Sequence, residues 1–124
     1  MSVINYLIRD ADRADLIIGR LSYDNHTRRF SITVEPNLPA DCPIMFSMAT
    51  RRKLTEFPQS WVDIWISERI IPSTRQNISD ILKSAGLKAY DEYGMLMFTQ
   101  GRCAQDNCYL EEVVSGNKAT SYFI

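Results

Sequence analysis

The chain has 124 residues, a length typical of one domain built around one hydrophobic core. Hydrophobic residues make up 45% and charged residues 23%, close to globular averages, which excludes a disordered or fibrous chain. Fourteen basic residues against fifteen acidic ones give a net charge of −1, so no overall field attracts a nucleic acid. Apolar runs are far shorter than the ~20 residues that cross a bilayer, and no basic-then-apolar leader opens the chain. We therefore expect one domain over residues 1–124, cytoplasmic and without membrane contact.

The first third of the chain has the pattern of β-strands. Residues 3–8 are mostly apolar and are predicted to form a strand, followed by a polar loop. Residues 16–35 are predicted to form a hairpin, because an apolar run at 16–23 and an alternating run at 30–34 flank a group of turn formers. Gly19, inside this hairpin, indicates a bulge or a close approach of another part of the chain.

Prolines separate the strands from a helical region. Pro36, Pro39 and Pro43 exclude the interior of a regular strand or helix, so they predict an extended connection. Helix-tolerant residues then occupy 47–56, and the next helix is predicted over 59–71.

A further helix is predicted after Pro72. Ser73 or Thr74 is expected to cap its N-terminus, with Gln76 completing a capping box, and Gly86 suits a left-handed C-terminal cap.

The last elements are a short helix over 89–99, a strand over 109–114, and residues 115–124, which we expect to fray. The sequence thus predicts an α+β fold. A small antiparallel sheet, made of the N-terminal hairpin and a C-terminal strand, packs against three to four short helices.

The residues do not favour catalysis. His26, the only histidine, lies among turn formers rather than beside a nucleophile. Neighbouring carboxylates at 91–92 and 111–112 point in different directions on a helix or strand, and no glycine-rich phosphate loop is present. Three cysteines, Cys42, Cys103 and Cys108, are expected to be free thiols, because too few partner ligands accompany them for zinc. We expect a non-enzymatic protein with no cofactor and no metal.

Two tryptophans one helical turn apart suggest a contact with another protein. Trp61 and Trp65 are difficult to bury together in so short a chain, and Arg69 lies one turn further on the same side. Tryptophan and arginine dominate the energetics of interfaces, and the polar segment GRCAQDNC adds Arg102. We predict a partner-binding surface of Trp61, Trp65, Arg69 and Arg102. In the alternative interpretation the tryptophans are core residues and GRCAQDNC is a structured turn.

The order of these segments resembles a known protein family. LIIGRLSYD, FSITVEP, DCPIMFSM, RIIPSTRQNISDIL and YDEYGMLMFTQGRCAQD together resemble the N-terminal subdomain 1 of HipA-type serine/threonine toxin kinases, over about residues 14–110. The ATP-binding loop, catalytic Asp segment and metal-binding Asp of the kinase core have no counterpart here. The resemblance therefore implies a free-standing, HipS-like small subunit of a bacterial toxin–antitoxin system. Such a subunit binds and restrains a HipA-like kinase, beside a DNA-binding antitoxin.

Two other functions stay open at this point. One is a small ligand-binding or enzyme domain with a pocket between sheet and helices, lined by Tyr93, Arg102 and Asp106. The other is a regulator subunit of a mobile element that touches DNA through the basic run at 51–53, although direct nucleic-acid contact is not favoured by the net charge.

Overall fold

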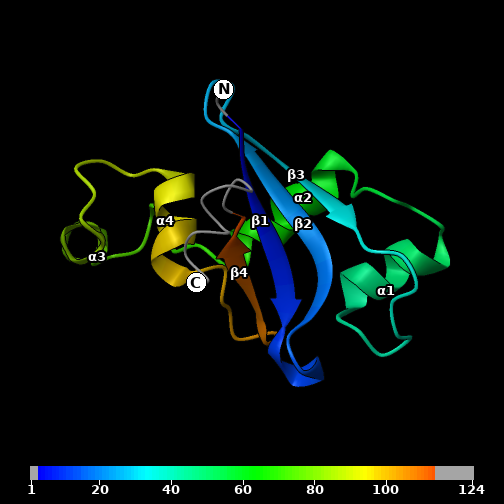
Figure 1. The fold of residues 1–124 in the computed structure, drawn as a ribbon. Helices are drawn as coiled ribbons and strands as arrows, with labels where there is room; N and C mark the ends of the chain where they lie inside the picture. Colours follow the sequence, from blue (N-terminus) through cyan, green and yellow to red (C-terminus); the bar gives the residue numbers. More distant parts are fainter. Residues whose placement is uncertain (1–2, 114–124) are drawn as a thin grey trace, which may run out of the picture.

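A four-stranded antiparallel sheet and four α-helices make up residues 3–113, the part of the chain that the computed structural model describes (Figure 1). In chain order the elements are β1 (Val3–Asp10), the 3-10 helix η1 (Ala11–Arg13), β2 (Leu16–Asp24), β3 (Arg29–Val34), α1 (Ile44–Arg51), α2 (Gln59–Ser67), α3 (Ile78–Ala85), α4 (Glu92–Thr99) and β4 (Cys108–Glu112). The strands lie in the order β3-β2-β1-β4. The predicted α+β fold is confirmed, with the hairpin and the C-terminal strand in one sheet. The expected fraying of 115–124 lies outside the described residues.

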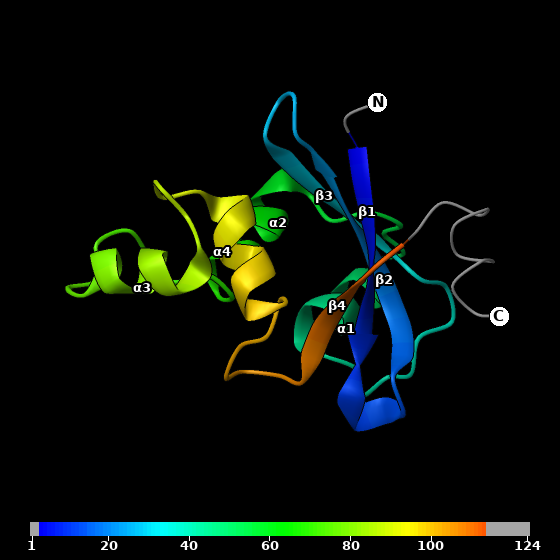
Figure 2. The ribbon, with the colours of Figure 1, turned by 60° about the vertical axis from the view of Figure 1, so that its left-hand side comes forward.

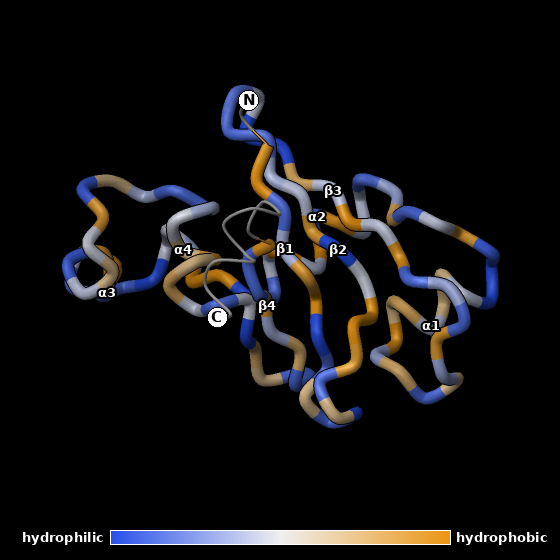
Figure 3. The backbone as a smooth tube through the Cα atoms, in the orientation of Figure 1, coloured by the Kyte–Doolittle hydropathy of each residue, from blue (hydrophilic) through white to orange (hydrophobic). Residues whose placement is uncertain are grey.

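One face of the sheet carries the core. Buried apolar side chains alternate along β1, β2 and β3 and pack against α1, α2 and α4; they include Tyr6, Ile8, Ile18, Leu21, Tyr23, Phe30 and Ile32. This alternation is the period of a strand with one buried face. The tip of the β2–β3 hairpin is hydrophilic (Figure 3).

β2 contains a β-bulge next to the point where α1 packs on it. Ile8 lies opposite Gly19 and Arg9 lies opposite Ile17, so Ile18 is the extra residue on β2. Phe46 of α1 packs directly on Gly19, where a Cβ atom would lie 2.7 Å from the Phe46 Cε2 and 2.6 Å from the Thr33 carbonyl oxygen. Both expectations for Gly19, a bulge and a close approach, are therefore met at the same place.

The free edge of β3 positions α2. The backbone N–H of Val34 donates to the Thr55 carbonyl oxygen at 2.9 Å, and the N–H of Phe57 donates to the Ile32 carbonyl oxygen at 2.9 Å. The segment before α2 is thereby paired along the edge, which fixes where α2 begins.

The bounds of the first two helices differ from those predicted. α1 begins at Ile44, directly after Pro43, because proline lacks the N–H that the first turn of a helix leaves unpaired. α2 ends at Ser67 rather than at residue 71, and its cap residue Glu68 donates its N–H to the Ile64 carbonyl oxygen.

The predicted capping box at the third helix is wrong. Arg75 donates its N–H to the Pro72 carbonyl oxygen, which makes residues 72–75 a turn, and α3 begins only at Ile78. Its C-terminal cap, Gly86, is left-handed as predicted. Figure 2 shows α3 lying beyond α4, away from the sheet. Within residues 3–113, no helix is long and apolar enough to cross a membrane.

Gly19→Ala is expected to lower the free energy of unfolding by about 2–3 kcal/mol, since the added methyl group overlaps Thr33 and Phe46. Gly86→Ala is the control, because its methyl group meets no atom within 4 Å and only the left-handed backbone is strained, at a cost of about 1 kcal/mol. Urea unfolding of both variants measures the difference. Equal losses of stability in the two variants would show that Thr33 and Phe46 do not exclude a methyl group at position 19.

Candidate functional site

Arg69 is a buried cation that connects three parts of the chain. It follows α2, and its side chain is completely shielded from solvent. Its Nη2 lies 2.5 Å from Oδ2 of Asp106, and its guanidinium lies 3.7 Å from the centre of the Trp65 ring. Its Nε has no hydrogen-bond partner within the described residues. Thr99, at the end of α4, donates its hydroxyl to the Arg69 carbonyl oxygen at 2.9 Å.

The segment GRCAQDNC is a structured turn between α4 and β4. Asp106 Oδ1 accepts the N–H of Cys108 at 3.0 Å, while its Oδ2 accepts from Arg69. Asn107 donates its side-chain amide to Asp12 at 2.8 Å. All three cysteines are free thiols, and burial raises the pKa of the Cys108 thiol to about 12. This geometry supports the turn interpretation of the segment.

The two tryptophans have different surroundings. Trp65 is 2% exposed and belongs to the core. Trp61 is half-buried, with its ring edge against Phe57 and the guanidinium of Arg52 5.6 Å from its centre. Trp61 is therefore the tryptophan with the larger exposed surface.

The four predicted contact residues do not form one surface. Trp65 and Arg69 lie together in the interior, at 2% exposure each, so each presents almost no side-chain surface in the free chain. Arg102 is exposed and lies 4.9 Å from the ring centre of Tyr109 in β4. Tertiary packing around Asp106, which the helical spacing does not reveal, draws Arg69 inward.

An exposed apolar surface lies instead on α1 and α2. A groove of about 110 Å³ separates the start of α1 from the end of α2; it is lined by Pro43, Ile44, Met45, Phe46, Trp65, Glu68, Gln105 and Asp106. Ile44 is 71% exposed beside it, and Ile64 on α2 is 51% exposed. We call Ile44, Ile64 and Trp61, together with this groove, the α1–α2 surface. Neither Ile44 nor Ile64 was among the contact residues predicted from the sequence.

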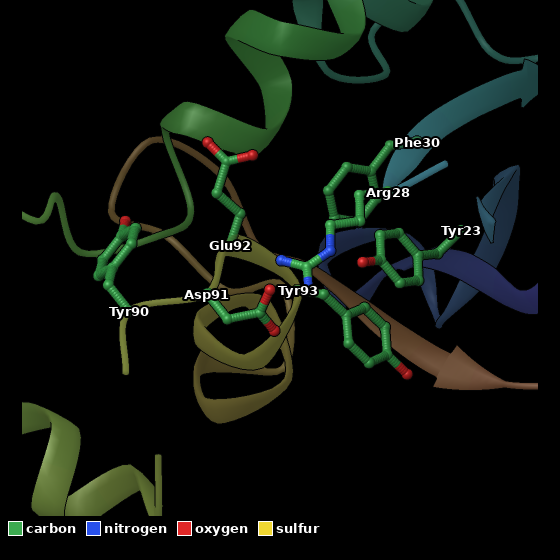
Figure 4. Close-up of a pocket in the computed structure, with 7 residues that line it drawn as sticks. All are labelled: Tyr23, Arg28, Phe30, Tyr90, Asp91, Glu92 and Tyr93. Carbon is green, nitrogen blue, oxygen red and sulfur yellow. The ribbon is translucent and has the colours of Figure 1, made fainter. Parts of the chain in front are cut away.

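A second hollow, of about 290 Å³, lies between the β2–β3 hairpin and the start of α4 (Figure 4). We call it the tyrosine pocket; its lining is Tyr23, Arg28, Phe30, Tyr90, Asp91, Glu92 and Tyr93. The rings of Tyr23 and Tyr93 are stacked, with centres 4.2 Å apart. Of the pocket residues predicted from sequence, Tyr93 lines it, but Arg102 and Asp106 do not.

Hydrogen bonds hold two of the tyrosines in place. The hydroxyl groups of Tyr6 and Tyr93 lie 2.5 Å apart, and burial together with this hydrogen bond raises the pKa of Tyr6. Tyr90 donates its hydroxyl to the Ile71 carbonyl oxygen at 2.7 Å. The aromatic walls are thus built on fixed side chains.

The fold and these surfaces define a small α+β domain with an exposed apolar surface and an aromatic pocket. Comparison with family models, with curated proteins and with solved structures finds no match to this chain. Among residues 3–113, no group of three or more His, Cys, Asp or Glu side chains is placed to hold a metal ion.

Asp106→Asn is expected to lower the free energy of unfolding by about 3 kcal/mol, because it removes the shorter ion pair of the buried Arg69 and leaves only the partly exposed Glu68, at 3.4 Å, as a charged partner. The double variant Arg69→Met with Asp106→Asn is expected to lose less than the sum of the two single variants. Denaturant unfolding of this double-mutant cycle measures the coupling, with exposed Arg102→Gln as control. Strictly additive losses would contradict a direct Arg69–Asp106 interaction.

Trp65→Ala is expected to lower the free energy of unfolding by about 3–5 kcal/mol, since it removes a buried ring. Trp61→Ala is expected to lose about 1–2 kcal/mol, because its ring is already partly exposed. In Trp61→Ala the remaining Trp65 should be shielded from acrylamide in fluorescence quenching. Strong quenching there would place Trp65 at the surface.

Proposed function

We propose that the chain is a non-catalytic protein-binding subunit, which associates with a HipA-like serine/threonine kinase of a toxin–antitoxin system and restrains it. The observation that carries the binding role is the α1–α2 surface, where Ile44 is 71% and Ile64 51% exposed beside a groove. The identity of the partner depends on the resemblance of about residues 14–110 to the HipA N-terminal subdomain.

The chemistry of the α1–α2 surface suits a protein partner. Contiguous exposed apolar side chains with a polar rim are typical of interaction sites. Arg52, which follows α1, lies over the ring of Trp61, and Glu68 lines the groove. Apolar side chains thus supply the area that a partner buries, and charges of both signs at the rim fix its orientation.

The groove itself is small. A volume of about 110 Å³ accommodates one apolar side chain of a partner rather than a free metabolite. Since Trp65 forms part of the floor and is fixed by Arg69, an inserted side chain meets a rigid wall. We expect a preorganised floor of this kind to favour affinity, because little ordering is needed on binding.

Restraint of the kinase follows from the nature of the subunit. A subunit that resembles the N-terminal subdomain of a kinase, without the kinase core, can occupy the position next to that core. Bound there, it holds the kinase core in an inactive arrangement. A separate DNA-binding antitoxin in the same complex is part of this proposal.

Ile64→Ser is expected to weaken binding to the kinase about tenfold or more, because it removes an exposed apolar contact without disturbing the core. Phe98→Ser on α4 is the matched control, since Phe98 is 45% exposed outside the α1–α2 surface. The tagged protein is first used to recover its partner from its own cells, with identification by mass spectrometry. Calorimetry and kinase autophosphorylation are then measured with each variant.

Two results would contradict the proposal. One is recovery of no HipA-like kinase from extract in which the tagged protein is folded and abundant. The other is equal binding by Ile64→Ser and Phe98→Ser, which would move the contact away from the α1–α2 surface.

A further inference from the structure

We propose that the tyrosine pocket binds the arginine side chain of a partner protein. The pocket is built by the β2–β3 hairpin and α4, and it shares no residue with the α1–α2 surface. The inference therefore stands independently of the proposed kinase partner.

The walls of the pocket suit a flat cation. Tyr23, Phe30 and Tyr93 form a continuous aromatic group, with Tyr23 and Phe30 ring centres 4.7 Å apart, and Tyr90 forms the facing wall. The faces of aromatic rings attract cations, and a guanidinium group can also stack on them. Figure 4 shows the Tyr23 hydroxyl pointing into the pocket, where its oxygen can accept a hydrogen bond from a guanidinium N–H.

Asp91 and Glu92 both line the pocket, and Figure 4 shows the Asp91 carboxylate beside the guanidinium of Arg28, whereas the Glu92 side chain points away from it. Asp91 Oδ2 accepts the N–H of Gly94 at 2.8 Å as the cap of α4, which leaves Oδ1 available. Among the ion pairs formed within residues 3–113, none includes Asp91 or Glu92. The opening thus combines aromatic faces with negative charge, and the cation that lies beside it, Arg28, forms no ion pair with it.

Arg28 shows that the space accepts a guanidinium. Figure 4 places its side chain between Tyr23, Phe30 and Asp91, yet it forms no ion pair within the described residues. It lies on the exposed hairpin turn with a left-handed backbone, at φ 61°. Because it is not anchored, an incoming arginine can displace it into solvent. Arg28 then competes with the ligand, whereas for an anionic ligand it would be the main binding group.

A cationic ligand would compete with Arg28, whereas an anionic ligand would bind to it, so a titration with a cationic ligand distinguishes the two classes. The ¹⁵N-labelled protein is titrated with N-acetyl-arginine amide, and the backbone amide signals of residues 91–93 are followed by NMR. We expect saturable shifts, and about tenfold weaker binding of the neutral, similarly shaped N-acetyl-citrulline amide. Free arginine should bind no more tightly than the blocked amide, because the pocket recognises the side chain.

Variants test the named residues. Asp91→Asn should weaken binding about fivefold, and asparagine still caps α4, so folding is retained. Glu92→Gln should weaken binding less, because the Glu92 side chain points away from the guanidinium of Arg28. Arg28→Gln should strengthen binding about threefold, as it removes the competing cation. The proposal is overturned if no saturable shift occurs, if the citrulline compound binds equally, if Arg28→Gln abolishes binding, or if only free arginine binds.

Discussion

Arg69 brings a full positive charge into the interior, and the surrounding structure is organised to accommodate it. Its guanidinium is stacked on Trp65 of α2 and paired with Asp106 at 2.5 Å. A buried charge is tolerated only when it is paired and hydrogen-bonded, so the fold must place Asp106 next to Arg69. Asp106 lies in the turn that connects α4 to β4, and it also accepts the N–H of Cys108, the first residue of β4. The position of the C-terminal strand thus depends on a charge at the end of α2.

The same arrangement shapes both candidate sites. Trp65, held by Arg69, and Asp106 both line the groove between α1 and α2. On the other side of the helical layer, α4 carries Tyr93 against Tyr23 and against the hydroxyl of Tyr6. The tyrosine pocket therefore depends on the position of α4, which Thr99 connects to the Arg69 backbone. The two surfaces present different chemistry: aliphatic side chains on the α1–α2 surface, and aromatic faces with carboxylates in the pocket.

The local pattern of the chain was sufficient for the fold class. The hairpin at 16–35 follows from alternation and turn residues, and Gly86 follows from the need for a left-handed cap. Helix bounds were less predictable, because they depend on neighbours that are distant in sequence. α2 begins where its preceding segment pairs with β3, and the hydroxyl and amide residues after Pro72 form a turn instead of a cap.

The sequence by itself determined the α+β class, the free thiols, the balanced charge and a tryptophan-containing helix against the sheet, since each depends on composition or on local periodicity. Only the tertiary structure decided which side of that helix is buried. Helical spacing places Trp61, Trp65 and Arg69 on one side, but it does not show that Asp106, 37 positions after Arg69, draws the arginine inward. It also does not show that Tyr23 and Tyr93, 70 positions apart, stack to form a pocket wall. Both contacts arise from long-range packing, which no local period in the sequence encodes.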